Sequence, residues 1–170
     1  MTAIARKVCL LGDFAVGKTS LVRRFVYNRF DDRYISTIGV KVSRKVIALP
    51  RENGAVELAL MLWDLAGNEE FDRVRISYLR GAAGAVLVCD LTRADTLDSL
   101  ERYIRDLHSV SPAARVVLAA NKNDLIDQRQ VPYERVAELA VSFGAPYYLT
   151  SARTGDEVEI MFRDLGQMLL

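Results

Sequence analysis

Short apolar runs alternate along this chain with longer segments in which apolar residues recur at helical spacing. A run that is apolar at nearly every position is typical of a strand with both faces covered. Residues 40–49 and 56–64 are predicted to form a hairpin with antiparallel pairing, because Asn53-Gly54 between them is a strong turn signal. Buried strands are predicted at residues 4–11, 85–91 and 115–120, and a short strand is predicted at residues 146–149.

Helical periodicity fills the gaps between these strands. The first helix is predicted at residues 18–28, and residues 65–80 open as a loop and end as a short helix. Asp95 should cap the next helix, and Pro132 suits the first turn of another, which Gly144 ends. These two helices and the last one bury Leu97, Leu100, Ile104 and Leu107, then Val136, Leu139, Ala140 and Phe143, then Val158, Phe162, Leu165 and Leu169.

The alternation of strands and helices predicts one α/β domain over residues 1–170. We expect a six-stranded, mostly parallel sheet with an antiparallel second strand, flanked by about five helices. Hydrophobic residues make up 51% and charged residues 26%, as in globular proteins. A net charge of +1 gives no electrostatic support for nucleic-acid binding. Cys9 and Cys89 lie in apolar runs, which favours buried free thiols over metal ligands.

Residues 12–19 read Gly-Asp-Phe-Ala-Val-Gly-Lys-Thr and fit the pattern G-x-x-x-x-G-K-[ST] between a predicted strand and a predicted helix. Such a loop turns its backbone N–H groups toward an anion, and the helix N-terminus adds partial positive charge. Lys18 should reach the β- and γ-phosphates, and the Thr19 hydroxyl should face Mg²⁺. This stretch predicts binding of a nucleoside triphosphate and leaves the base open.

A second polar segment, Asn-Lys-Asn-Asp at 121–124, selects the base. The Asp124 carboxylate can accept two hydrogen bonds from guanine, whereas adenine lacks that pair of donors, and an unpaired buried carboxylate is costly. Asn121 should tie this turn to the phosphate loop, and the stem of Lys122 should lie over the base. The backbone N–H of Ala152 is placed for the guanine carbonyl and Phe30 for the edge of the base. Taken singly, each segment is an ordinary polar turn.

Four polar or small residues directly follow predicted strands: Gly12, Asp64, Asn121 and Thr150. Ligands of parallel α/β sheets bind beyond the carboxyl ends of the strands. The four residues should therefore converge at one edge of the sheet.

With these motifs in order, the sequence resembles the Ras superfamily of small GTPases over its whole length, and most closely the Rab branch. The superfamily motifs are residues 12–19, Thr37, Asp-Leu-Ala-Gly at 64–67, Asn-Lys-Asn-Asp at 121–124 and Thr-Ser-Ala at 150–152. The Rab-like residues are Tyr-Ile-Ser-Thr-Ile-Gly-Val at 34–40, Trp-Asp at 63–64 and Tyr-Leu-Arg-Gly-Ala at 78–82. The resemblance implies the P-loop small-GTPase fold.

The resemblance also implies a molecular switch that binds GTP and Mg²⁺ and hydrolyses GTP to GDP and phosphate. Two loops, at about 30–40 and 65–80, would change with the γ-phosphate; the alternative is that they are simple surface loops. The metal ligands implied are Thr19, Thr37 and Asp64, and the catalytic residues are Lys18, Asn68, Thr37 and Gly67. The nucleotide contacts implied are Gly12, Asp13, Phe14, Ala15, Val16, Gly17, Lys18, Thr19, Ser20, Phe30, Tyr34, Thr37, Asp64, Gly67, Asn121, Lys122, Asp124, Ser151, Ala152 and Arg153.

Three positions depart from the family pattern. Asn68 replaces the glutamine that orients the attacking water, and this shorter amide predicts slow hydrolysis. Phe14 replaces a small residue; its ring either crowds the γ-phosphate and a partner's arginine, or points to solvent or the switch loop. Lys41 lies where Rab proteins are acidic, so Rab effectors are not transferred to this chain. Arg73 and Arg75 lie in the second loop. We expect them on a solvated helix face rather than in a position to stabilise charge that develops on the phosphate.

Two alternatives to the leading function stay open. Phe14 and Asn68 together suit a hydrolysis-deficient, nucleotide-bound interaction module that is regulated by exchange. An ATP-dependent kinase is disfavoured, because Asp124 selects against adenine.

The sequence predicts a cytoplasmic protein. It shows no secretory signal, no apolar run of membrane-spanning length and no C-terminal cysteine for lipidation, so we expect no membrane anchor within the chain. The expected partners are guanine nucleotide, and protein effectors and regulators that contact the switch loops.

Overall fold

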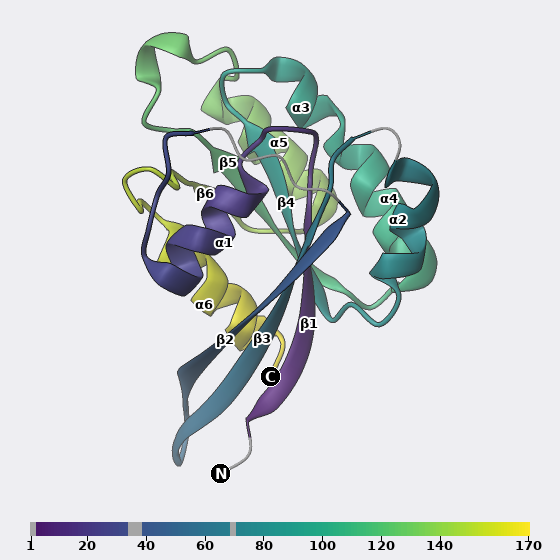
Figure 1. Ribbon diagram of the computed structural model, residues 1–170, viewed down its shortest axis with the longest axis vertical. Helices are drawn as coiled ribbons and strands as arrows, with labels where there is room; N and C mark the ends of the chain where they lie inside the picture. The colour runs from purple at the N-terminus through teal and green to yellow at the C-terminus, as the bar shows by residue number, and fades with distance from the viewer. Residues whose placement is uncertain (1–2, 34–38, 69–70) are drawn as a thin grey trace.

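The six predicted strands form one sheet in the order β2-β3-β1-β4-β5-β6 (Figure 1). The computed structural model describes residues 3–33, 39–68 and 71–170. β2 pairs antiparallel with β3, and every other pairing is parallel, as predicted. The strands are β1 (Ile4–Leu11), β2 (Val40–Arg51), β3 (Gly54–Leu65), β4 (Gly84–Asp90), β5 (Arg115–Asn121) and β6 (Tyr147–Leu149).

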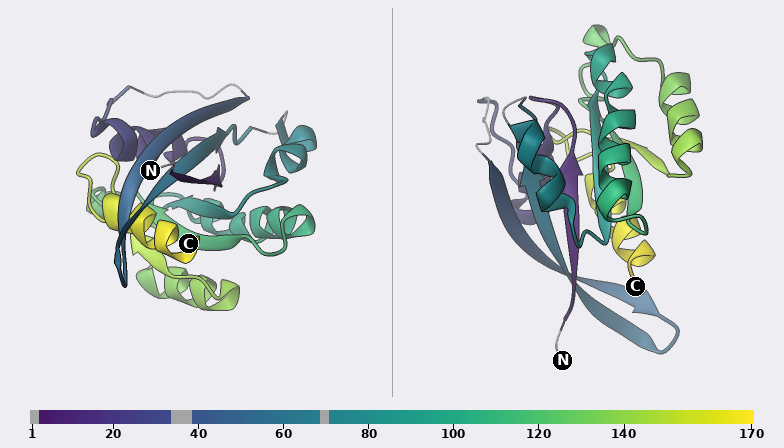
Figure 2. Two further views of the ribbon diagram at one scale, coloured as in Figure 1. Left: turned by 90° about the horizontal axis from the view of Figure 1, so that it is seen from below. Right: turned by 90° about the vertical axis from the view of Figure 1, so that its right-hand side faces the viewer.

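Helices cover both faces of this sheet (Figures 1 and 2). α1 (Lys18–Tyr27) and α6 (Val158–Met168) pack on one face. The other face carries α2 (Asp72–Leu79), α3 (Ala94–Asp98), α4 (Leu100–Val110) and α5 (Tyr133–Phe143), and a 3₁₀ turn, η2 (Ile126–Gln128), follows β5. Within the described residues, no helix is both long enough and apolar enough to span a bilayer.

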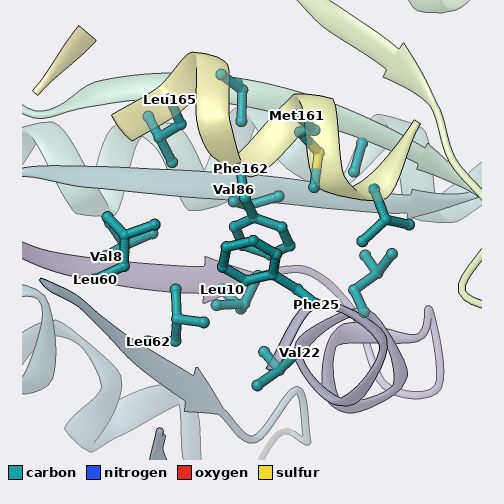
Figure 3. Packing of buried hydrophobic residues seen from close by; sticks show 14 of the residues in the cluster. Val8, Leu10, Val22, Phe25, Leu60, Leu62, Val86, Met161, Phe162 and Leu165 are labelled. Carbon is teal, nitrogen blue, oxygen red and sulfur yellow. The ribbon is translucent and has the colours of Figure 1, made fainter. Parts of the chain in front are cut away.

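The core on the α1/α6 face is organised around a pair of stacked phenylalanines (Figure 3). The ring centroids of Phe25 in α1 and Phe162 in α6 lie 4.3 Å apart with 12° between the ring planes. Leu10 and Leu62 line the sheet beneath them. This contact joins the helix that follows the phosphate loop to the last helix of the chain.

Both cysteines are buried free thiols, as expected. Burial raises the pKa of Cys9 to about 11 and that of Cys89 to about 12. The thiols are therefore protonated and unreactive at neutral pH.

The predicted hairpin is longer than its sequence signal suggested. β2 continues to Arg51 and β3 begins at Gly54, so Glu52 and Asn53 alone form the turn. Pro50 pairs with Ala55 inside the ladder. A residue without an N–H group is tolerated there because β2 is an edge strand.

The prediction that Asp95 caps a helix is wrong. Asp95 lies inside α3, which begins one residue earlier. The single helix predicted for this region is divided at Ser99 into α3 and α4. The Ser99 hydroxyl oxygen lies 2.6 Å from an Asp13 carboxylate oxygen and 3.0 Å from the carbonyl oxygen of Asp95, and these two acceptors share its single proton. A serine that bonds back to the preceding turn bends a helix, and here a second partner in another segment holds the bend.

We predict that Phe162→Ala lowers the free energy of unfolding by about 3–5 kcal/mol, because it removes the ring that stacks on Phe25 and leaves a cavity. Ile160→Ala on the same helix is the matched control, since Ile160 is 53% exposed. Chemical denaturation monitored by circular dichroism measures both variants. Equal losses for the two would contradict the assigned role of the stack.

Candidate nucleotide site

The loop between β1 and α1 is pressed against the ends of two neighbouring strands. A Cβ on Gly12 would lie 2.3 Å from the carbonyl oxygen of Val88 in β4. A Cβ on Gly17, whose φ is 107°, would lie 2.3 Å from the amide nitrogen of Asn121 in β5. Neither position has room for a side chain, so the two glycines of the motif are fixed by packing as well as by backbone conformation.

Lys18 is folded over the loop. Its ammonium donates to the carbonyl oxygens of Gly12 at 2.7 Å and Asp13 at 3.0 Å. Burial lowers the pKa of Lys18 to about 8, although the carboxylates of Asp64 and Asp13 act in the opposite direction. The charges of Arg75 and Arg93 also lower this pKa. A buried cation in this position is suited to an anionic phosphate group.

The acidic side chain of the loop is turned away from the cradle. The carboxylate of Asp13 accepts hydrogen bonds from Ser99 at 2.6 Å and from the Tyr103 hydroxyl at 2.9 Å, both on the α3–α4 segment. Burial, with Asp13 nearby, raises the pKa of Tyr103 to about 12. The loop thus keeps a carboxylate without placing its charge toward an anion.

Thr19 and Asp64 form the candidate magnesium site. The Thr19 hydroxyl donates to the Asp64 carboxylate, which is 2% exposed at the end of β3. A hydroxyl and a carboxylate are oxygen donors of the kind that Mg²⁺ takes beside phosphate and water. The parts of the chain that the structure describes hold no cluster of three or more His, Cys, Asp or Glu suited to a metal. These two residues fit a magnesium ion whose remaining ligands come from phosphate and water.

The base-selecting segment is bonded to the phosphate loop, as predicted. The Asn121 amide donates to the carbonyl of Val16 at 3.0 Å and accepts from Thr150 at 3.1 Å. One oxygen of Asp124 accepts from the Ser151 hydroxyl at 2.8 Å. The carboxylate is therefore held by the loop that follows β6. Gly12, Asp64, Asn121 and Thr150 meet at one edge of the sheet, and these bonds link them.

Asp90 and Arg93 contact residues that line the pocket, without lining it themselves, and the sequence reasoning missed them. Asp90, at the end of β4 and 1% exposed, contacts the Lys122 ammonium at 2.9 Å and Arg93 Nε at 3.2 Å. Arg93 Nη2 donates to the carbonyl of Phe14 at 2.7 Å. Burial raises the pKa of Asp90, but hydrogen bonds from Thr92 and Lys122 outweigh it and hold the pKa below its usual value. A charged residue at a strand's carboxyl end was the available signal for Asp90.

Arg24 in α1 is a further residue that the motifs do not contain. Its guanidinium donates to the carbonyls of Ala152 at 2.8 Å and Arg153 at 2.5 Å. Nη1 also reaches Asn28 at 3.1 Å. The side chain thus joins the first helix to the loop predicted to contact the base.

These segments enclose a pocket of about 310 Å³, a size typical of small-molecule sites. Of the predicted contacts, Gly12, Asp13, Val16, Asp64 and Ser151 do not line it, and they support it from behind. Tyr34 and Thr37 lie outside the described residues, so their roles stay predictions. The predicted contacts that line the pocket are Phe14, Ala15, Gly17, Lys18, Thr19, Ser20, Phe30, Gly67, Asn121, Lys122, Asp124, Ala152 and Arg153.

The two family departures near the phosphates have different placements. Phe14 is 48% exposed and is one of the residues that line the pocket. Asn68 is exposed and is not among the lining residues; its amide oxygen accepts from the backbone N–H of Phe71 at 3.1 Å, just before α2. Asn68 therefore bonds back to the chain just before α2, a local bond that its short side chain favours. Between them, Gly67 packs so closely that a Cβ would lie 2.6 Å from the Phe14 nitrogen.

The expectation that Arg75 lies on a solvated helix face is wrong. Arg75 is 2% exposed and contacts the carboxylates of Asp72 and Asp106, the latter at 2.8 Å. Its guanidinium also lies 4.6 Å from the centroid of the Tyr103 ring. The residue anchors α2 to α4. Arg73 is exposed, as expected.

Comparison with known proteins supports the family resemblance. The Ras family model matches residues 7–170. The GTP-binding protein ypt4 of Schizosaccharomyces pombe is 39% identical over 158 residues, which cover 92% of this chain and 68% of that protein. The Ras-related protein Rab-31 of Rattus norvegicus is 37% identical over 164 residues, covering 96% and 82%. The Ras-related protein Rab-8B of Homo sapiens is 37% identical over 166 residues, covering 96% and 78%.

The matched span contains the phosphate loop, the Thr19–Asp64 pair and the segment that holds Asp124, so the similarity includes the site as well as the sheet. The chain thus belongs to the Ras family, close to its Rab branch, and is a GTP-binding switch GTPase that uses Mg²⁺.

Proposed function

We propose that residues 1–170 form a single G domain whose pocket orients GTP with the base against Asp124 and the phosphates along residues 12–19. The observation that carries this orientation is the separation of charge across the pocket. Ser151 fixes the Asp124 carboxylate on one side, and the Lys18 ammonium is folded over the loop on another. A carboxylate suits the guanine donors, and an ammonium suits the β- and γ-phosphates.

In this proposal Thr19 and Asp64 hold the metal, joined by Thr37 in the GTP state. Mg²⁺ supplies neutralisation of charge on the phosphates. Gly67 lies against the phosphate loop, so its backbone N–H is placed to respond to the γ-phosphate. Lys18 neutralises phosphate charge while a water, positioned by Asn68 and the backbone of Thr37, attacks the γ-phosphorus in line, without a covalent intermediate.

We propose further that intrinsic hydrolysis is slow. Asn68 is one methylene shorter than glutamine, and its amide oxygen bonds to the Phe71 N–H outside the pocket. It must give up that bond before it can orient water. A misplacement of ~1 Å in a positioning group costs on the order of 10²-fold in rate.

A second candidate is a nucleotide-bound interaction module that turns over too little to be reset by hydrolysis. Phe14 favours it, because its side chain lines the pocket where a partner's arginine would have to enter. In that case exchange of GDP for GTP is the regulated step. Phosphate release followed over hours from the GTP-loaded protein separates the two candidates.

We also propose that effectors and regulators contact the switch segments at about 30–40 and 65–80, and that the protein acts in the cytoplasm. The described part of the second segment supports this contact. It presents Val74, Ile76 and Tyr78 to solvent.

Asp124→Asn tests the proposed base contact. Each lost charge-assisted hydrogen bond is worth about 1.5–3 kcal/mol, so GTP affinity should fall by 10-fold or more. The preference for GTP over ITP, which lacks the exocyclic amine, should shrink as well. Competition against a fluorescent GDP analogue measures both. Asp127→Asn, a change at an exposed carboxylate nearby, is the control. An unchanged GTP-to-ITP preference in Asp124→Asn would overturn the assignment.

Asn68→Gln tests the reason given for slow hydrolysis. The longer amide should raise the single-turnover rate of GTP hydrolysis by roughly 10- to 100-fold, since glutamine places its amide one methylene farther along. Release of labelled phosphate from preloaded protein gives the rate. Asn123→Gln, a like change at a residue bonded to Tyr133, controls for the extra methylene. No gain from Asn68→Gln would mean that another group limits the reaction.

A further inference from the structure

Arg93 lies beside the phosphate loop without belonging to any of the family motifs. It follows β4 at the N-cap of α3, and its Nη2 donates to the carbonyl oxygen of Phe14 at 2.7 Å. Nε contacts Asp90 at 3.2 Å. The side chain is 38% exposed, so its guanidinium is held at two points and still has solvent on one side.

This contact places the guanidinium against the backbone of the phosphate loop, although Arg93 itself does not line the pocket. The Lys18 ammonium binds the carbonyls of residues 12 and 13, and Arg93 binds the next carbonyl along the chain, one peptide unit of ~3.8 Å farther. Gly67 packs on the nitrogen of the same residue, Phe14. The charge of Arg93 acts on Lys18, and Lys18 and Gly67 are the residues placed to meet the γ-phosphate.

The local charges leave Arg93 available to an anion. Asp90 is the carboxylate within ion-pair distance of Arg93 among the described residues, and it also pairs with Lys122. One negative charge is thus shared by two cations. Asp13, the nearest other carboxylate in the loop sequence, is bonded to Ser99 and Tyr103. The pair of cations carries one unbalanced positive charge beside the phosphate loop.

We propose that Arg93 is a catalytic arginine supplied within the chain, which stabilises the charge that develops on the β–γ bridging oxygen during GTP hydrolysis. The proposal rests on the phosphate placement proposed above. Asp90 is buried and fixed, so the Asp90 contact is a pivot from which the half-exposed guanidinium turns toward the phosphates. Planar arginine donors match phosphate oxygens in a way that a lysine ammonium does not.

The step is an ordinary hydrolysis with one added contact. The water oxygen bonds to the γ-phosphorus as the bond to the β–γ bridging oxygen breaks, and the electron pair of that bond stays on GDP. The water proton leaves with inorganic phosphate or passes to solvent. Arg93 forms no covalent bond and donates hydrogen bonds to the oxygen that gains charge. Arginines in this role act either from within the chain or from a partner.

Arg75, the second arginine whose charge acts on Lys18, is less suited to this role. Arg75 is almost fully buried, is held by two carboxylates and stacks on Tyr103. If Arg75 moved, the carboxylates of Asp72 and Asp106 would lose the cation that they share. Phe14 also lines the pocket that an arginine from a partner would enter. An arginine already in contact with the Phe14 carbonyl needs no such entry.

The test compares Arg93→Ala and Arg93→Lys with the wild-type protein in three measurements. These are the Kd for GDP, the single-turnover rate of GTP hydrolysis without a partner, and binding of aluminium fluoride to the GDP form, a mimic of the transition state. Arg135→Ala is the matched control, because Arg135 is also half-exposed and pairs with one aspartate, Asp98, on the outer surface. Circular dichroism checks that each variant is folded.

We expect Arg93→Ala to slow hydrolysis by roughly 10²-fold and to abolish the aluminium fluoride complex, with GDP affinity changed less than 3-fold. Arg93→Lys should recover only part of the rate, and Arg135→Ala should match wild type. A wild-type rate in Arg93→Ala overturns the proposal. So does a loss of GDP affinity equal to the loss of rate, which would make Arg93 a support of the Phe14 carbonyl. If Arg93→Ala does not fold, Arg93→Lys decides: a full wild-type rate overturns the proposal. Failure of wild type to bind GDP would instead refute the proposed function.

Discussion

The close approach of the phosphate loop to β4 and β5 is the constraint on which the site depends. Gly12 touches the backbone of Val88, and Gly17 touches the side chain of Asn121, at separations that admit no Cβ. Asn121 in turn holds the carbonyl of Val16. The loop is therefore positioned by the register of the parallel strands and by the packed core beneath them. Its ability to bind an anion depends on the same packing that stabilises the sheet.

Those parts of the site that are local in sequence were predictable, and the parts made by tertiary proximity were not. The bond between Asn121 and the loop follows from two recognisable motifs that lie at neighbouring strand ends. The roles of Arg24 and Arg93 depend on which backbone carbonyl each guanidinium bonds to in the folded chain, and the sequence does not show this. Arg75 shows the same limit, because apolar and polar residues are mixed along α2 and the sequence gives no sign that one arginine turns inward. The fold was accessible because apolar periodicity is set within each element.

Two local rules compete at Asn68. An asparagine favours local bonds from its side chain to nearby backbone N–H groups, and the structure shows Asn68 bonded to the N–H of Phe71. The family's water-orienting position requires the same amide to point toward the nucleotide. A glutamine forms such local bonds less readily, so it gives up less on turning inward. The substitution that shortens the side chain thus also stabilises the arrangement in which the amide is not catalytic.

Arg24 couples the phosphate loop mechanically to the loop that is proposed to contact the base. The helix that begins with Lys18 and Thr19 also carries the guanidinium that grips the carbonyls of Ala152 and Arg153. If Ala152 and Lys18 meet the base and the phosphates as proposed, this one helix joins the two ends of the nucleotide site. A fluctuation that frees one end of the ligand would then strain the other end and slow its release. A factor that tilts this single helix would speed that release without touching the base.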